Sequence, residues 1–255
     1  MSVTEQLLEI FKYGVSSVQP NNILDNFIKV QNKKIIVKEG SKQKIYSKIN
    51  RVFPICIGKA SVDMAKKIKK IFKKGNFKAE KGILIVNKEN FTEVEGFKCF
   101  NSGHPIPNKN GFKASKFLEN YLSKLEKDDL VLIFISGGGS ALAPYPANGI
   151  KLEEKLIMNK ILLESGANIK EINIVRKHLS KLKGGNLVKI CNPAHVHSFI
   201  LSDVIGDDLG SIASGMTIYD NSTFTNVKKI LNKYKIWTKV PKNIKNHINN
   251  GEKKK

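Results

Sequence analysis

Four short apolar runs along the chain are typical of β-strands that are buried on both faces. They cover residues 51–57, 82–87, 130–136 and 197–203. Amphipathic helical patterns lie between them, at residues of about 108–125 and at 152–163. This alternation of strands and helices predicts a parallel sheet with helices on both of its faces. The pattern therefore favours an α/β fold.

The two ends of the chain show other patterns. An amphipathic helix is expected at residues 4–18, and residues 33–37 and 43–45 are expected to pair as a hairpin. Residues 239–255 are polar and rich in lysine. We expect one α/β domain over residues 1–238, followed at residues 239–255 by the start of a further domain.

The composition is that of a globular protein. Of the 255 residues, 41% are hydrophobic, and no run of about 18 uncharged apolar residues occurs. The first residues are acidic and amphipathic, whereas a signal peptide is basic and then apolar. Cys56, Cys99 and Cys191 are odd in number and widely spaced, which argues against a disulfide framework or a zinc site. We therefore expect a cytoplasmic protein with reduced thiols and no membrane association.

The formal net charge of +22 raises the question of nucleic-acid binding. Nearly all of the positive charge is lysine, since Arg51 and Arg176 are the only arginines. Reading of bases and bidentate capture of phosphate favour arginine, and no known nucleic-acid motif accompanies the charge. The lysines are also spread along the chain. We do not expect a specific nucleic-acid partner.

Polar and glycine-rich segments follow three of the predicted strands. These segments are Gly58-Lys59, Ser136-Gly137-Gly138-Gly139-Ser140, and the stretch from Ser202 to Asp208. A lysine at a helix start attracts anions, and glycines let backbone N–H groups approach a ligand. Carboxylates beside phosphate suit Mg²⁺. Ligands bind beyond the carboxyl ends of parallel strands, so we expect Lys59, the glycine loop and Asp203 to converge in one cleft.

Each of these segments also has a structural explanation. Lys59 could be a surface lysine whose stem covers apolar residues, the glycines a tight turn, and one aspartate an Asx-turn or helix cap. Neither a P-loop nor a dinucleotide fingerprint is present, because Phe53 and Ala60 stand where a P-loop needs glycine and a hydroxyl residue. Three histidines are expected to be structural: His104, His195 and His197.

Taken together, these segments resemble the glycerate 2-kinases of the MOFRL-containing type. The resemblance rests on GKASVDMA (58–65), SGHPIPN (102–108), ISGGGSALAPYPANGI (135–150), LLESGANIKEINIVRKHLSKLKGGNL (162–187) and ILSDVIGDDLGSIASG (200–215). The segments occur in the order and spacing of that family and cover nearly the whole chain. The sequence is similar to the large N-terminal domain of such a kinase.

The resemblance implies ATP-dependent phosphorylation of D-glycerate at its 2-hydroxyl, with Mg²⁺, to give 2-phosphoglycerate. It also implies a Rossmann-like three-layer α/β/α sandwich with a mainly parallel sheet, and a homodimer when the protein is complete. The implied catalytic residues are Lys59, Arg176 and Asp203. The implied binding residues for substrate and phosphate are Ser136, Gly137, Gly138, Gly139, Ser140, Lys183 and Gly184, and the implied metal ligands are Asp203 and Asp207.

Two other functions remain open at this point. Some relatives of the family are described as hydroxypyruvate reductases, but the sequence lacks a dinucleotide fingerprint with an acidic residue about 20 residues beyond it. A basic module that binds anions or nucleic acid is the non-enzymatic alternative. The family continues into a smaller C-terminal domain that closes over the cleft. We therefore expect the 255 residues to be the N-terminal part of the enzyme and to be inactive alone.

Overall fold

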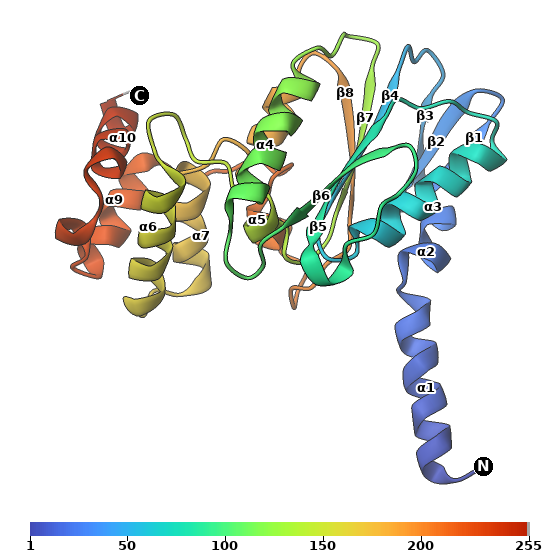
Figure 1. Ribbon diagram of the computed structural model, residues 1–255, viewed down its shortest axis with the longest axis horizontal. Helices are drawn as coiled ribbons and strands as arrows, with labels where there is room; N and C mark the ends of the chain where they lie inside the picture. The colour runs from blue at the N-terminus through green and yellow to red at the C-terminus, as the bar shows by residue number, and fades with distance from the viewer. Residues whose placement is uncertain (254–255) are drawn as a thin grey trace.

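The computed structural model describes residues 1–253, and a five-stranded parallel sheet lies at its centre (Figure 1). Its strands are β4 (Val52–Ile57), β5 (Gly82–Asn87), β6 (Phe97–Ser102), β7 (Leu130–Ile135) and β8 (His195–Ile200). They lie in the order β6-β5-β4-β7-β8, and each neighbouring pair is parallel. The prediction of a parallel α/β sheet is confirmed.

Helices cover both faces of this sheet, which gives three layers (Figure 1). All residues of β4, β5 and β7 are buried, as their continuous apolar runs predict. On one face, Ile55 of β4 packs in a core with Leu118 of α4 (Lys109–Leu122). On the other face, Cys56 of β4 packs in a core with Ile68 of α3 (Ser61–Lys74). Successive strand residues thus fill opposite cores.

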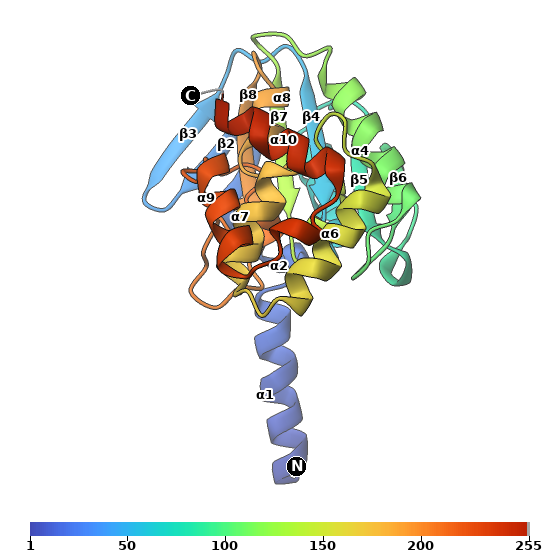
Figure 2. The same ribbon diagram turned by 90° about the vertical axis from the view of Figure 1, so that its left-hand side faces the viewer.

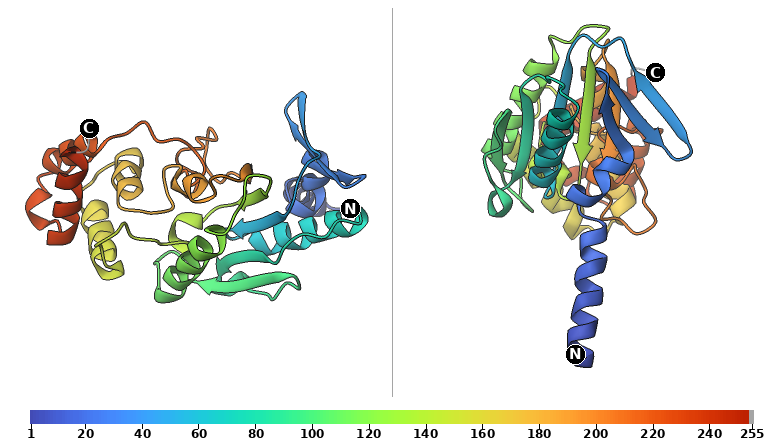
Figure 3. Two further views of the ribbon diagram at one scale, coloured as in Figure 1. Left: turned by 90° about the horizontal axis from the view of Figure 1, so that it is seen from above. Right: turned by 90° about the vertical axis from the view of Figure 1, so that its right-hand side faces the viewer.

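The N-terminal segment adds a helix that extends away from the body of the molecule (Figures 1 and 3). This helix, α1 (Val3–Ser17), has no buried residue. It is followed by α2 (Pro20–Phe27) and by an antiparallel sheet of β1 (Ile28–Gln31), β2 (Lys34–Glu39) and β3 (Lys42–Tyr46). The predicted helix and hairpin are both present, and β1 is an additional strand.

Four helices form a cluster with its own apolar core beside the sheet (Figure 2). They are α6 (Leu152–Glu164), α7 (Ile169–His178), α9 (Phe224–Lys233) and α10 (Lys242–Lys253). The polar residues at the end of the chain belong to this cluster, because Ile244 and Ile248 of α10 are fully buried in it. Residues 242–253 therefore pack with the other helices of this cluster, and the expected domain boundary at residue 239 stays a prediction.

The observed strands differ from the expected ones in two places. β8 ends at Ile200, earlier than the apolar pattern suggests, so Asp203 lies in the following loop. β6 was not expected, because its sequence FKCFNS lacks a continuous apolar run and it lies at the edge of the sheet. The remaining short helices are η1 (Lys88–Asn90), α5 (Gly139–Leu142), α8 (Asn186–Ile190), η2 (Ile212–Ser214) and η3 (Trp237–Lys239).

An ion pair joins the amino ends of the two central strands. Arg51 donates from Nε to Oδ1 of Asp129 at 3.0 Å and from Nη2 to Oδ2 at 2.6 Å. The Asp129 side chain is fully buried. Burial raises the pKa of Asp129, but the hydrogen bonds from Arg51 and from the Glu126 N–H outweigh it and lower the pKa overall. The pair holds β4 and β7 together at the end of the sheet opposite the glycine loop.

Cys56, Cys99 and Cys191 are free thiols, and burial raises the pKa of Cys191 to about 12. Within residues 1–253, no helix combines the length and apolar character needed to cross a membrane.

Candidate functional site

The order of the strands places a candidate site at the carboxyl ends of β4 and β7. The chain builds the sheet outward from β4 in one direction through β6, then returns to add β7 on the other side of β4. Open α/β sheets bind ligands in the crevice at such a reversal of strand order. The loops that leave β4 and β7 contain Lys59 and the glycine loop, residues 136–140.

Hydrogen bonds join these two loops directly. The Lys59 N–H donates to the Gly137 carbonyl at 2.9 Å, and the Ala60 N–H donates to Oγ of Ser136 at 3.0 Å. Gly58 has a φ of +134°, and a Cβ there would collide with Ser136. Ser136, expected to line the cleft, is itself buried and fixes the turn after β4. Its hydroxyl therefore positions Lys59.

The glycines of the loop make room for three polar side chains from distant segments. A Cβ on Gly137 would collide with the carboxylate of Asp203. A Cβ on Gly138, whose φ is +82°, would lie 2.9 Å from Cδ2 of His104 and 3.2 Å from Cε of Lys59. Lys59, Asp203 and the glycine loop therefore converge, as the sequence predicts. His104, expected to be structural, lies against the same loop.

His104 is held toward its neutral form at this position. Burial lowers its pKa, and the positive charge of Lys59 lowers the pKa further, while Glu89 and Asp203 oppose these effects. A neutral imidazole can accept or donate a hydrogen bond to a ligand. His104 belongs to the segment SGHPIPN. Its side chain reaches the site only because of the way the loop between β6 and α4 folds.

The loop offers donors to an anion. Gly138 caps the short helix α5, and the hydrogen bonds of the described residues leave the N–H groups of Gly138, Gly139 and Ser140 without a protein acceptor. Lys59 is exposed beside them. Backbone N–H groups at a helix start together with an ammonium favour a negatively charged ligand.

Asp203 can contribute to a cation site, but the described residues contain no complete one. Its side chain is exposed, and no hydrogen bond or ion pair among residues 1–253 occupies its carboxylate. Those residues include no cluster of three or more candidate metal ligands. One carboxylate fits Mg²⁺ only if substrate oxygens complete the coordination. Asp207 is exposed four positions later, and its role as a ligand stays a prediction.

Arg176 and Lys183 line a small cavity together with Ser140, the last residue of the glycine loop. Lys183 is 1% exposed and donates from Nζ to the Ser140 carbonyl oxygen at 2.8 Å. Arg176 is half-buried and donates from Nε to Oδ1 of Asn159 at 3.2 Å. The hydroxyl of Ser140 lies 3.0 Å from that of Ser214. Ser140 thus connects the glycine loop to Lys183, and Arg176 lines the same small cavity as both residues.

Gly184 follows Lys183, and its N–H donates to the Ser214 carbonyl at 3.2 Å, so its role in binding stays a prediction. It adopts a φ of +61°, and a Cβ there would lie 3.2 Å from the side chain of Asp220. It lines a polar hollow of about 300 Å³ together with Lys177 and Asp220. Its conformation shapes the turn after Lys183.

Sequence reasoning missed one residue beside Arg176 and Lys183. Lys155 of α6 is 4% exposed, and its Nζ has no hydrogen-bond partner among the described residues. It shares the buried face of the helix with Leu152, Met158 and Leu162. The sequence signal for its burial was its position, because Lys155 stands at the helical spacing of these apolar residues.

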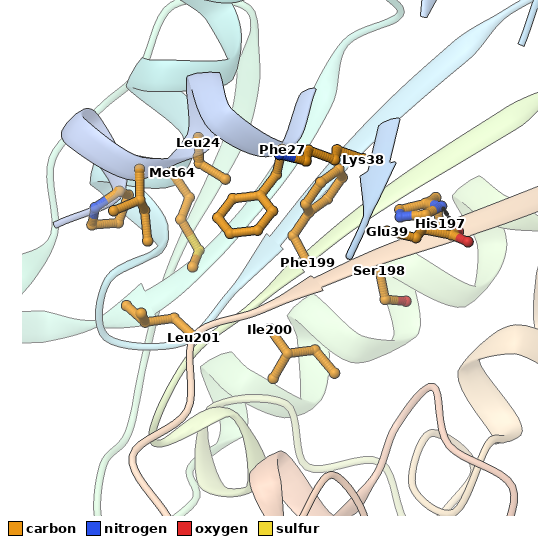
Figure 4. Close-up of a pocket in the computed structure, with 12 residues that line it drawn as sticks. Leu24, Phe27, Lys38, Glu39, Met64, His197, Ser198, Phe199, Ile200 and Leu201 are labelled. Atoms are coloured by element: carbon orange, nitrogen blue, oxygen red, sulfur yellow. Dashed lines mark ion pairs between the residues drawn. The ribbon is translucent and has the colours of Figure 1, made fainter. Parts of the chain in front are cut away.

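A separate apolar cavity lies between α2, α3 and β8 (Figure 4). It encloses about 280 Å³, and Leu24, Phe27, Met64 and Phe199 point into it. At its rim Nδ1 of His197 lies 3.4 Å from Oε1 of Glu39. No residue of the glycine loop lines this cavity. Its surface is mainly apolar, whereas the site at the glycine loop presents charged groups.

Comparisons with known proteins agree with this geometry. Residues 6–249 match a family described as "Domain of unknown function (DUF4147)". The chain belongs to this family. It is 39% identical over 251 residues to the glycerate 2-kinase of Pyrococcus horikoshii, covering 98% of this chain and 55% of that protein. The chain thus spans about half the length of the curated relatives it matches.

Two solved structures share the fold of this DUF4147 chain. A crystal structure of a protein from Pyrococcus horikoshii OT3 superposes with a TM-score of 0.89 at 38% identity, over 99% of this chain and 56% of that one. A crystal structure of glycerate kinase from Thermotoga maritima superposes with a TM-score of 0.81 at 32% identity, over 96% and 54%. These likenesses confirm the α/β architecture around the candidate site.

Proposed function

We propose that this chain is the N-terminal part of a glycerate 2-kinase, which transfers a phosphoryl group from ATP to the 2-hydroxyl of D-glycerate. The observation that carries the proposal is the convergence of Lys59, Asp203 and the glycine loop where the strand order reverses. Phosphoryl transfer depends mainly on positioning and on stabilisation of negative charge. These groups can supply both, and the relatives named glycerate kinase support this choice of reaction.

Each group has a role in the proposed reaction. The N–H groups of Gly138 and Gly139 would bind phosphate oxygens, and the ammonium of Lys59 would neutralise charge that develops during transfer. Asp203, with Asp207, would hold Mg²⁺, which supplies charge neutralisation to the phosphates when bound. His104, beside Gly138, would donate a hydrogen bond to substrate or receive one.

The structure weighs against the two alternatives. A hydroxypyruvate reductase would need a nicotinamide cofactor, but the turn after β4 reads Gly58-Lys59-Ala60 and lacks the G-x-G-x-x-G fingerprint of dinucleotide-binding folds. A nucleic-acid module would use exposed basic groups, whereas the basic groups beside the glycine loop include Lys155 and Lys183, which are buried. Both facts favour a small anionic ligand.

Further parts of the proposal concern the whole protein. The relatives are about twice as long as the matched region, so we infer that a C-terminal domain closes the cleft and excludes water during transfer. We also propose a homodimer and a cytoplasmic location, which the free thiols support. The 255-residue chain alone should then turn over negligibly.

The test is a coupled assay for 2-phosphoglycerate on this chain joined to the expected C-terminal domain, with D-glycerate, ATP and Mg²⁺. Lys59→Met should lower turnover by about 10²- to 10³-fold, the loss typical of a preorganised charge-stabilising donor. Lys70→Met, on the exposed face of α3, is the matched control. Reduction of hydroxypyruvate by NAD(P)H without kinase activity would refute the proposal, and equal rates for both variants would remove Lys59 from the mechanism.

A further inference from the structure

A small cavity lies where the loop after β7 meets helices α6 and α7. It encloses about 90 Å³ and is lined in part by Pro105, Ser140, Lys155, Arg176 and Lys183. A void of roughly 10–15 Å³ is enough for one water molecule. The cavity therefore has room for a group the size of a carboxylate and its attached carbon.

Three cations from three segments surround this cavity. Lys155 comes from α6, Arg176 from α7 and Lys183 from the loop after α7. No acidic side chain lines the cavity, and no carboxylate of residues 1–253 forms an ion pair with any of the three. The described residues therefore offer no carboxylate partner to these three basic groups.

Lys155 is the member of the group that lacks any partner. Lys183 donates to the Ser140 carbonyl and Arg176 donates to Asn159, but Nζ of Lys155 is buried without a hydrogen bond to the described residues. Burial of an unpaired ammonium beside two further cations opposes folding. Burial, followed by the charge of Arg176, lowers the pKa of Lys155 to about 7. Arrangements that oppose folding in this way are expected at functional sites.

The cavity adjoins the glycine loop through two shared segments. Ser140 ends the loop, and its carbonyl oxygen accepts the hydrogen bond from Lys183. His104 lies against Gly138, and the next residue, Pro105, lines the cavity. An anion in the cavity would therefore lie beside the place proposed for the transferred phosphoryl group.

We propose that Lys155, Arg176 and Lys183 bind the carboxylate of the acceptor substrate. The identity of this acid as glycerate rests on the proposed kinase function, whereas the charge pattern requires only a small oxyanion. The phosphates have their own donors at the glycine loop, which leaves the carboxylate as the second anionic group of the reaction. A carboxylate accepts hydrogen bonds from ammonium and guanidinium groups together, so it would give Lys155 its missing partner.

The test measures binding to the 255-residue chain by calorimetry, with D-glycerate, glycerol and inorganic phosphate as separate probes. We expect D-glycerate to bind, and glycerol, which lacks the carboxylate, to bind at least about 10-fold more weakly. Lys155→Met should weaken the binding of D-glycerate by about 10- to 100-fold, the effect of a hydrogen bond to a charged group. Lys160→Met is the control, because Lys160 lies on the same helix with a side chain that is 78% exposed.

A second readout separates binding from a structural role. At pH 8 Lys155 is mostly neutral, and an anion beside it should raise its pKa, so D-glycerate should bind with uptake of protons. Calorimetry in two buffers of different ionisation heat measures this uptake, which Lys155→Met should lower. The charged groups that face Lys155 are Arg176 and Lys183. Proton uptake that remains in Lys155→Met is expected to come from Lys183.

Several results would overturn the inference. Unchanged affinity for D-glycerate in Lys155→Met would do so, as would equal binding of glycerol or binding of inorganic phosphate alone at this site. Loss of binding accompanied by a lower melting temperature in Lys155→Met would indicate a structural lysine. Failure of the kinase proposal would look different, because Lys155-dependent binding of D-glycerate would persist without any transfer of phosphate from ATP.

Discussion

Replacement of Lys155 by methionine should make this chain more stable, and the gain should depend on pH. Burial lowers the pKa of Lys155 from 10.5 to about 7. Because one pKa unit equals about 1.4 kcal/mol, this difference corresponds to about 5 kcal/mol. The folded-state pKa lies below the unfolded value, so the loss of stability is complete below pH 7, shrinks as pH rises, and disappears above pH 10.5.

Methionine keeps most of the volume of the lysine stem and removes the charge. A volume-conserving replacement in a core costs about 1 kcal/mol. The net gain in the free energy of unfolding should therefore be about 3 to 4 kcal/mol at pH 6 and about zero at pH 9.5. Arg176 and Lys183 are the charged groups that face Lys155, and the replacement also removes repulsion from Lys183.

The assay is urea unfolding followed by circular dichroism at pH 6, 8 and 9.5, on the unmodified chain, Lys155→Met and Lys160→Met. Lys160→Met should change stability by less than about 0.5 kcal/mol at each pH, as expected of an exposed lysine. A loss of stability in Lys155→Met at pH 6 would refute the reasoning. So would a difference that does not change with pH, because it would show that the charge of Lys155 is not the cause.

Three further outcomes follow from the geometry. Gly137→Ala should displace the exposed carboxylate of Asp203 and lower kinase turnover of the complete enzyme by at least about 10-fold. Gly14→Ala should leave turnover unchanged, because no atom lies within 4 Å of a Cβ built there and Gly14 has no positive φ. Equal turnover in these two variants would show that Asp203 takes no part in the reaction. Asp129→Asn should lower the free energy of unfolding at pH 7 by about 3 kcal/mol, since it breaks a buried ion pair. Because the pKa of Asp129 is lowered in the folded state, this difference should shrink as pH falls below about 4, and a constant difference in urea unfolding would contradict it. Deletion of residues 1–18 should change the free energy of unfolding by less than about 1 kcal/mol, because α1 has no buried residue, and a larger loss would show that α1 contributes to the core.

The local patterns of the sequence were enough to predict the main strands and the chemistry that follows them. Buried parallel strands must be apolar on both faces, so β4, β5 and β7 are visible as continuous runs. Glycines, a lysine and an aspartate directly after such runs indicate a ligand site, since parallel strands end at a common edge. The strand β6 lies at the edge of the sheet and lacks this pattern, which is why it was not predicted.

Only the tertiary structure decided the order of the strands and which further side chains join the site. The order of the strands is a property of long-range pairing, and it places the loops after β4 and β7 side by side where the order reverses. The burial of Lys155 depends on α6 packing beside Arg176 and Lys183, which are remote in sequence. When only the local segment is considered, a lysine is expected to be exposed to solvent. Its burial and its pKa are set by neighbours from other segments. The sequence by itself therefore determined the strands and the residue types at their ends, and packing determined that three cations share one cavity without a carboxylate.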